Sequence, residues 1–150
     1  MAEPSSIEKY RLYSFVNMYL SDKQKGIQTT HVTSQMTVKW KNFDEHTYVF
    51  GVWAEEDKTV IMLNGGYSSN LRAIYKTCKK FSKEYDNFLP YVKFHESEDA
   101  LDGALTAVGI ILPADVYDFA AALRKGLVNT DSCSKAEVDF YTMLNSCPLA

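Results

Sequence analysis

The pattern of apolar and polar residues predicts strands that alternate with helices. Residues 10–20 (YRLYSFVNMYL) have two largely apolar faces, which is typical of a central strand covered on both sides. The two faces are Leu12, Val16, Met18 and Leu20, and Tyr13, Phe15 and Tyr19. Ser21-Asp22 then offers an N-cap, and Ser21 and Gln24 have capping-box spacing. We expect a helix from there to about Trp40, with one stripe formed by Ile27, His31, Ser34 or Gln35, and Val38.

A hairpin and a second helix are expected next. Residues 47–54 (TYVFGVWA) and 59–64 (TVIMLN) predict two strands around the polar turn 55–58. Asn64-Gly65-Gly66 ends the second strand, and Ser68 or Ser69 is expected to cap a helix. One side of that helix is apolar and consists of Leu71, Ile74, Tyr75, Cys78 and Phe81.

The rest of the chain predicts two more strands and two helices. Pro90 precedes a strand, YVKFH, and the polar loop 96–103 leads to an apolar strand, LTAVGIIL. Pro113 suits the first turn of a helix that ends at Gly126. Its inward side is expected to be Val116, Phe119, Ala120 and Leu123. Ser134 and Glu137 form a second capping box, for a short C-terminal helix.

These elements predict an α/β fold. The order β-α-β-β-α-β-β-α-α implies one domain over residues 1–150, with a mixed sheet of four to five strands flanked by helices. The first strand–helix–strand passage supports a parallel pairing, and the hairpin an antiparallel one. We expect residues 1–9 to be a flexible N-terminus and 131–150 to be a C-terminal helix and tail.

Composition narrows the possible partners. The net charge of −3 predicts no general attraction to nucleic acid or to an anionic membrane, so anion binding requires a local cluster. The N-terminus has no apolar signal region and no run is long enough for a membrane span, so we expect a cytoplasmic protein. Three cysteines without CxxC spacing indicate free thiols, and neither a metal site nor a cofactor is expected.

The first candidate site is the start of the first helix. Lys23 and Lys25 lie there beside unpaired backbone N–H groups and the positive end of the helix dipole, which together favour an anion. Gln28 and His31 are three residues apart and so share a helix face. A neutral His31 can act as a general base or hold a ligand. The alternative is a solvated lysine pair and a partly buried histidine with its hydrogen bonds satisfied.

Two further segments are candidates. The strand–glycine–helix junction 64–69 can present backbone N–H groups to a phosphate, with Ser68 at the helix start and Tyr67 available to cover a base, although it is not a Walker A sequence. His95 and Glu96 stand beside more carboxylates, which permits a catalytic cluster or a metal site. Solvated loop carboxylates are the more common case, and strict metal-ligand spacing is absent.

A fourth possibility combines two of these segments. His31-Val32-Thr33 and His95-Glu96-Ser97 are two His-x-Thr/Ser triplets, and such triplets resemble the motif of the two-histidine phosphoesterases. The resemblance implies that the histidines act as acid and base across a phosphodiester. That family carries its triplets inside strands, however, and His31 is predicted to be in a helix.

Three segments follow one another within residues 10–115: Gln28-Thr29-Thr30-His31, residues 59–71 and Gly103-Ala104-Leu105-Thr106. They resemble, in this order, the Gln-x-x-His helix, the second strand and helix, and the Gly-x-x-Thr strand of the type II peptidyl-tRNA hydrolases. The resemblance implies that family's α/β fold and a pocket that accepts an RNA end. The chain has Gln24 where the family has a lysine and Phe94 where it has a catalytic aspartate, although Glu96 can approach the same space.

The small size, the Tyr- and Lys-rich composition and the altered site also resemble those of small phage-encoded accessory proteins. Some of these proteins sequester or cleave nucleotide signals of bacterial antiviral defence. We therefore expect a protein of the host cytoplasm that binds a phosphate-bearing nucleotide-type molecule, and a second copy of the chain is a candidate partner. The ligand-binding candidates are Lys23, Lys25, Gln28, His31, Tyr67, Ser68 and Thr106. The alternatives are a hydrolase of peptidyl-tRNA or of a cyclic nucleotide, with candidates His31, His95 and Glu96, and a protein-interaction module.

Overall fold

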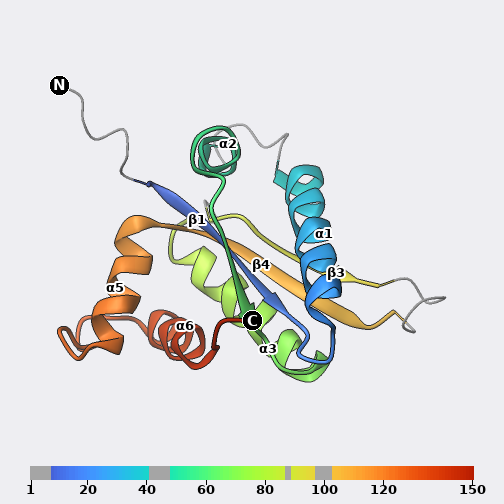
Figure 1. Ribbon diagram of the computed structural model, residues 1–150. Coiled ribbons are helices and arrows are strands. Elements are labelled where there is room, and N and C mark those ends of the chain that lie inside the picture. The colour runs from blue at the N-terminus through green and yellow to red at the C-terminus, as the bar shows by residue number, and fades with distance from the viewer. Residues whose placement is uncertain (1–7, 41–47, 87–88, 97–102) are drawn as a thin grey trace.

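The computed structural model describes residues 8–40, 48–86, 89–96 and 103–150. Its regular elements account for most of these residues and are labelled in Figure 1. In chain order they are β1 (Tyr10–Val16), α1 (Asp22–Trp40), α2 (Tyr48–Val52), the π-helical turn η2 (Trp53–Asp57), β2 (Val60–Asn64), α3 (Ser68–Lys83), β3 (Tyr91–His95), β4 (Leu105–Pro113), α5 (Ala114–Arg124) and α6 (Lys135–Ser146).

The strands of the described chain form one mixed sheet with the order β2-β1-β4-β3. β1 and β2 are parallel, which confirms the pairing expected of the first strand–helix–strand passage. β4 runs antiparallel to both of its neighbours, β1 and β3. The chain is therefore an α/β domain with a four-stranded sheet, as the sequence predicted.

Helices cover both faces of the sheet (Figure 1). α1, α2 and η2 lie on one face, where Val32, Met36 and Trp53 pack against Leu12 and Val16 of β1. α3, α5 and α6 lie on the other face and bury the side chains of Tyr13 and Phe15 together with residues of β2 and β4. The prediction that β1 is covered on both sides is confirmed.

The prediction of a hairpin formed by residues 47–54 and 59–64 is wrong. The described residues of that segment, 48–54, form α2 and the start of η2, and the antiparallel pairings are made by β4. Val49 and Trp53 are four residues apart and both buried, which is helical spacing, and they pack into the same core cluster as β1. The aromatic and β-branched residues of this segment favour a strand only where a neighbouring strand is available to pair with it. Here packing against the core favours a helix instead.

Two details of the first strand and helix also differ from prediction. β1 ends at Val16, and Met18 and Tyr19 are exposed in the turn that follows. The stripe containing Ile27 and Val38 is not the buried side of α1, since both residues are exposed. The buried residues of α1 are Gln28, Thr29, Val32, Met36 and Trp40.

The predicted helix starts are confirmed at two positions and wrong at a third. Ser21 and Gln24 exchange the two hydrogen bonds of a capping box, both of 3.2 Å. Ser134 and Glu137 form a capping box at α6. The N-cap of α3 is instead Tyr67, which makes no side-chain cap, and Ser68 is the first helical residue.

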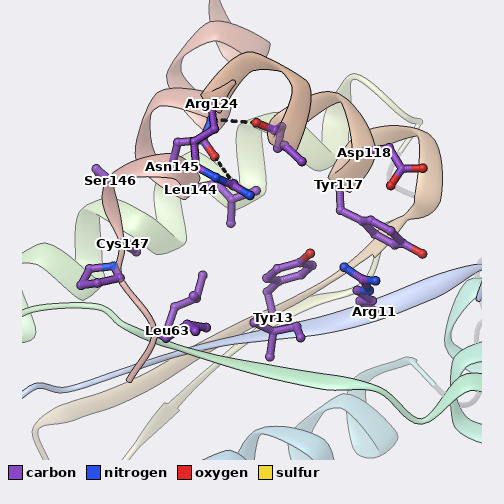
Figure 2. A pocket seen from close by; sticks show the side chains of 15 residues that line it. Arg11, Tyr13, Leu63, Tyr117, Asp118, Arg124, Leu144, Asn145, Ser146 and Cys147 are labelled. Atoms are coloured by element: carbon purple, nitrogen blue, oxygen red, sulfur yellow. Dashed lines mark hydrogen bonds between the residues drawn. The ribbon is translucent and has the colours of Figure 1, made fainter. Parts of the chain in front are cut away.

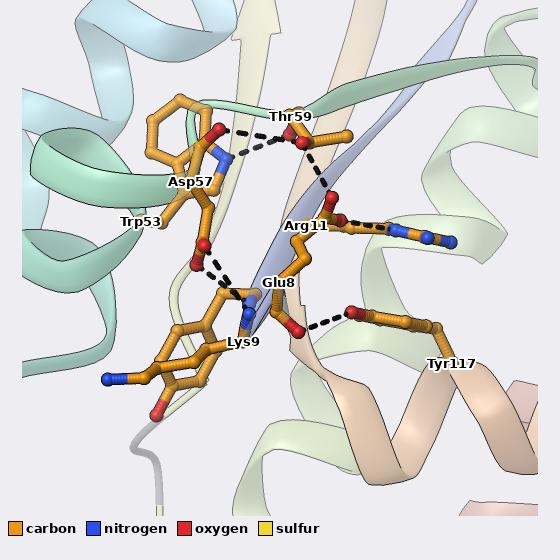
Figure 3. Close-up of polar contacts among 8 residues, drawn as sticks. Glu8, Lys9, Arg11, Trp53, Asp57, Thr59 and Tyr117 are labelled. Atoms are coloured by element: carbon orange, nitrogen blue, oxygen red, sulfur yellow. Dashed lines mark hydrogen bonds and ion pairs between the residues drawn. The ribbon is translucent and has the colours of Figure 1, made fainter. Parts of the chain in front are cut away.

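The N-terminal end of β1 is held by polar contacts with η2, β2 and α5 (Figure 3). The Asp57 carboxylate accepts backbone N–H bonds from Lys9 at 3.3 Å and Tyr10 at 2.9 Å. The Glu8 carboxylate accepts from Thr59 at 2.9 Å, and its backbone carbonyl accepts from Tyr117 at 3.0 Å. Residues 1–7 of the expected flexible N-terminus lie outside the described residues, whereas Glu8 and Lys9 are fixed by these contacts.

The C-terminal segment ends on the sheet. After α6, the tail runs antiparallel to β2 and bridges Leu63 with Leu149. Its backbone makes hydrogen bonds of 2.8 Å from Asn64 N to Pro148 O and 3.0 Å from Ala150 N to Met62 O. Among the helices of the described residues, none combines the length and the apolar character needed to cross a membrane.

Candidate functional site

The site is built where the two parallel strands end. β1 and β2 both end at the side of the sheet from which α1 begins, the side at which open α/β sheets bind ligands. The turns after the two strands are tied together by hydrogen bonds from Gly65 N to Val16 O at 2.8 Å and from Met18 N to Gly66 O at 2.9 Å. Gly66 has φ +77°, and a Cβ there would lie 2.2 Å from the Asn70 amide, so this turn requires glycine.

Three candidate residues from distant parts of the chain meet at this end of the sheet. Thr106 donates to the Gln28 side-chain oxygen at 2.8 Å, and the Gln28 amide nitrogen donates to the Glu96 carboxylate at 2.9 Å. Gln28 and Thr106 are 4% and 1% exposed, so their bond is shielded from water. The amide of Gln28 is thereby fixed in one orientation, with its nitrogen directed to the carboxylate.

A β-bulge aims Thr106 at this cluster. Phe94 pairs with Ala107 and His95 pairs with Leu105, so Thr106 is an extra residue on β4 without a partner on β3. Val108 and Ile110 point to the α3 side of the sheet, and regular alternation would send Thr106 there as well. The bulge turns its hydroxyl toward α1 instead, a role that bulges commonly have beside binding sites.

An exposed aromatic pair adjoins the cluster. Tyr19, after β1, and Tyr67, after β2, stack with their ring centroids 4.6 Å apart, although they are 78% and 44% exposed. A side-chain hydrogen bond with Tyr67 raises the pKa of Tyr19. Asn17 connects the pair to the cluster. Its side-chain oxygen accepts from the backbone N–H of Tyr19 at 3.0 Å, and its backbone N–H donates to the backbone carbonyl of Thr106 at 3.0 Å.

Positive charge is available at the start of α1. Lys23 is exposed and Lys25 is half-buried in the first turns of the helix. Within the described residues, neither ammonium group lies within ion-pair distance of a carboxylate. Ser68 makes a different contribution, since its hydroxyl donates to Leu105 O at 3.2 Å and so fixes the start of α3 against β4.

The two candidate histidines make separate contacts. His31 stacks on Phe94, with centroids 4.4 Å apart and planes at 17°. His95 uses Nδ1 for a 3.0 Å hydrogen bond with the Gly103 carbonyl. His31 lies in helix α1, and Ser97 of the second His-x-Ser triplet is outside the described residues, as are Glu98 and Asp99. The described contacts bring His31 to Phe94, rather than to His95.

Three residues of the site are not predicted by the sequence. Its apolar pattern places Asn17 and Tyr19 in the first strand, although a polar residue inside an apolar run signals the end of a strand or a polar contact. Phe94 stands where the resemblance implies an aspartate, and it supports the ring of His31. Its position two residues before Glu96 offered no local signal for that stacking.

The comparisons with known proteins assign no family to the chain. No protein-family model matches the sequence, and no curated protein is significantly similar to it. Within the described residues there is no group of three metal-ligating side chains. Any function must therefore be argued from the site itself.

Proposed function

We propose that this protein binds a small, phosphate-bearing nucleotide-type molecule at the end of β1 and β2. The observation that carries the proposal is the exposed Tyr19–Tyr67 stack beside a helix start with two lysines. Exposed aromatic faces bind nucleobases by stacking, worth about 1–3 kcal/mol per base. Lys23, Lys25 and the N–H groups of the first turn of α1 would hold the phosphate.

The polar cluster of Gln28, Glu96 and Thr106 offers hydrogen-bonding groups in fixed orientations to a ligand. Gln28 is fixed by Thr106, and Glu96 supplies a carboxylate beside it. In nucleotide sites, carboxylates of this kind accept hydrogen bonds from ribose hydroxyls. His31 lies on the same face of α1 as Gln28 and stacks on Phe94, and it would orient the ligand. A protein that retains the intact nucleotide in this way would sequester a nucleotide signal, as a phage counter-defence protein does.

The phosphate part of the proposal is tested by charge removal. Mononucleotides, cyclic dinucleotides and ADP-ribose are titrated by calorimetry and thermal shift, and the ligand is recovered and analysed by chromatography. We expect at least one to raise Tm and to be recovered intact, and Lys25→Gln to weaken its binding about tenfold. Lys76→Gln removes an equal charge from α3 and should leave binding unchanged. Equal losses in both variants, or no binding by wild type, would contradict the proposal.

The stacking part of the proposal is tested with a variant and a matched control. Tyr67→Leu removes one ring of the stack, whereas Tyr48→Leu removes an exposed ring from α2. We expect only Tyr67→Leu to weaken nucleotide binding, about tenfold or more. If ribose phosphate without a base binds as well as the nucleotide, stacking has no part in recognition.

Hydrolysis is a second candidate, favoured by the Gln28–Glu96 hydrogen bond. It places a carboxylate beside the Gln-x-x-His face of α1, near the space for which the hydrolase resemblance implies an acidic residue. Glu96 would then act as general base toward water, with ester cleavage of peptidyl-tRNA as the reaction. Release of free tRNA that is lost in Glu96→Gln supports this candidate, and no turnover at high protein concentration excludes it. Linearisation of a cyclic dinucleotide that needs both His31 and His95 would instead support the phosphodiesterase.

We further propose that the fold is that of the type II peptidyl-tRNA hydrolases. β1 with α1, β2 with α3, and β4 after Gly103 occur in the order that the resemblance implies. An experimental structure superposed on a member of that family tests this proposal. A different connection of β4 to the sheet would contradict it.

A further inference from the structure

A cavity lies on the opposite face of the sheet from α1. It has a volume of about 550 Å³, within the size range of small-molecule sites. Its floor consists of side chains from β1 and β2, and α5, the end of α6 and the C-terminal tail form its walls (Figure 2). The middle of the α5 wall is formed by the small side chains of Ala120 and Ala121, which leave space above the floor.

Two arginines reach this cavity from different elements. Arg11 comes from β1 and lies flat over the ring of Tyr117, 4.0 Å from its centroid. Arg124 comes from the last turn of α5, and Tyr13 lies between the two on the floor of the cavity (Figure 2). Burial raises the pKa of Tyr13. Its hydrogen bond to Arg11 and the positive charge of Arg124 act to lower that pKa, so both guanidinium groups interact with the Tyr13 hydroxyl.

Arg124 is held in place without being neutralised. Its Nη1 donates to the Asn145 side-chain oxygen at 2.8 Å, and the Asn145 amide donates to Ala120 O at 3.1 Å. Asn145 is uncharged, and within the described residues no carboxylate lies within ion-pair distance of Arg124. A guanidinium that is ordered by neutral partners keeps its charge and its remaining N–H donors for an anion.

The charge of Arg11, unlike that of Arg124, is paired. Glu8 forms an ion pair with Arg11 by accepting from its Nε, and it also accepts from the Thr59 hydroxyl. Arg11 therefore contributes its remaining N–H donors, and Arg124 the unpaired charge. Asp118 lies at the rim, on the side of Tyr117 away from Arg124 (Figure 2). The remaining lining is mostly apolar and includes Ile61, Leu63 and Leu144.

We propose that this cavity binds a small molecule in which an oxyanion, carboxylate or phosphate, is attached to an apolar ring. The oxyanion lies between Arg11, Arg124 and the Tyr13 hydroxyl, and the ring lies over Leu63 and Leu144. Enclosure by four elements favours a small molecule over a protein surface. The site is separate from the proposed nucleotide site, because this cavity is lined by none of Lys25, Gln28, Tyr67 and Thr106.

The test uses three probes with one ring system: 2-naphthoate, 2-naphthyl phosphate and the neutral 2-naphthamide. Each is titrated into the full chain while amide resonances are followed by NMR, which gives both the Kd and the location. We expect at least one anion to bind with shifts at Leu63, Tyr117 and Arg124, and the amide to bind at least tenfold more weakly. The better anion distinguishes a carboxylate from a phosphate ligand.

Three variants complete the test. Arg124→Gln should weaken anion binding about tenfold and leave 2-naphthamide unchanged, whereas Lys125→Gln removes the neighbouring exposed charge and should change neither. Ala121→Phe fills the cavity and should abolish binding of all three probes. Equal binding of amide and anions, equal effects at Arg124 and Lys125, or shifts confined to α1 would overturn the proposal. The nucleotide variants Lys25→Gln and Tyr67→Leu lie outside the lining of this cavity, so the two proposals fail independently.

Discussion

The hydroxyl of Thr106 donates a 2.8 Å hydrogen bond to the side-chain oxygen of Gln28, although the two residues are 78 positions apart. Both side chains are buried, and each satisfies a polar atom of the other. The bond attaches α1 to the start of β4 and fixes the amide that faces Glu96. Stability and ligand binding should therefore depend on the same contact.

Thr106→Val tests that contact. The substitution keeps the shape but leaves the Gln28 oxygen without its buried donor, so we expect the free energy of unfolding to fall by about 1–3 kcal/mol. Nucleotide affinity should fall as well, because Gln28 can then rotate. Thr142→Val, at an exposed position of α6, is the matched control for urea denaturation. A loss of stability no greater than that of the control would show that the bond contributes nothing.

Gly109→Ala should destabilise the protein through α1. A Cβ at this position of β4 would lie 2.4 Å from Cγ1 of Val32, so the helix would have to move away from the sheet. We expect a loss of about 1–3 kcal/mol in the free energy of unfolding, and partial recovery when Val32→Ala is added. Gly51→Ala has open space around it and is expected to be neutral or slightly stabilising. Additive effects of Gly109→Ala and Val32→Ala would contradict the proposed clash.

The three cysteines should differ in reactivity. Cys78 is fully buried, and burial raises its pKa far above the ordinary value, which leaves almost no thiolate. Cys133 and Cys147 are half-buried and have raised pKa values from the same cause. Iodoacetamide labelling with peptide mapping should modify these two slowly in the native protein and Cys78 only in urea. Labelling of Cys78 at the rate of Cys133 in the native protein would contradict the packing of α3.

Alkaline pH should destabilise the fold. Burial raises the pKa of Tyr13, Tyr85 and Tyr141, so the native state holds protons that the unfolded chain loses above about pH 10. The stability is complete below that pH and falls as the pH rises, by up to about 1.4 kcal/mol per pH unit for each tyrosine. Lys39 acts in the opposite direction, because burial lowers its pKa. Urea denaturation from pH 8 to pH 11 measures the slope, and a constant free energy of unfolding would contradict the prediction.

Local chemistry allowed much of the fold to be predicted. The capping boxes at Ser21 and Ser134 depend on residues three apart in sequence, and both are present in the structure. The apolar side of α3 follows from helical periodicity, and the almost completely buried β4 from its largely apolar run. Residues 48–54 could not be assigned in this way, since an apolar run of that length suits a strand or a helix until its neighbour is known.

The candidate site was only partly predictable for the same reason. Gln28 and Thr106 are candidates through the resemblance to the hydrolase family, but their hydrogen bond depends on the bulge that turns Thr106 out of the regular alternation. The stacking of Tyr19 on Tyr67 needed the true end of β1 at Val16. The cavity between Arg11 and Arg124 joins elements that no sequence pattern relates.

The sequence by itself determined the α/β class, the two-sided burial of β1 and the start of α1, because periodicity and capping act over a few residues. Only the tertiary structure decided which face of α1 is buried and which side chains meet Gln28. Those outcomes depend on how closely α1 can approach the sheet over Gly109, and on one extra residue in β4. Contacts of this kind depend on packing between segments that are distant in sequence, so local sequence patterns cannot predict them.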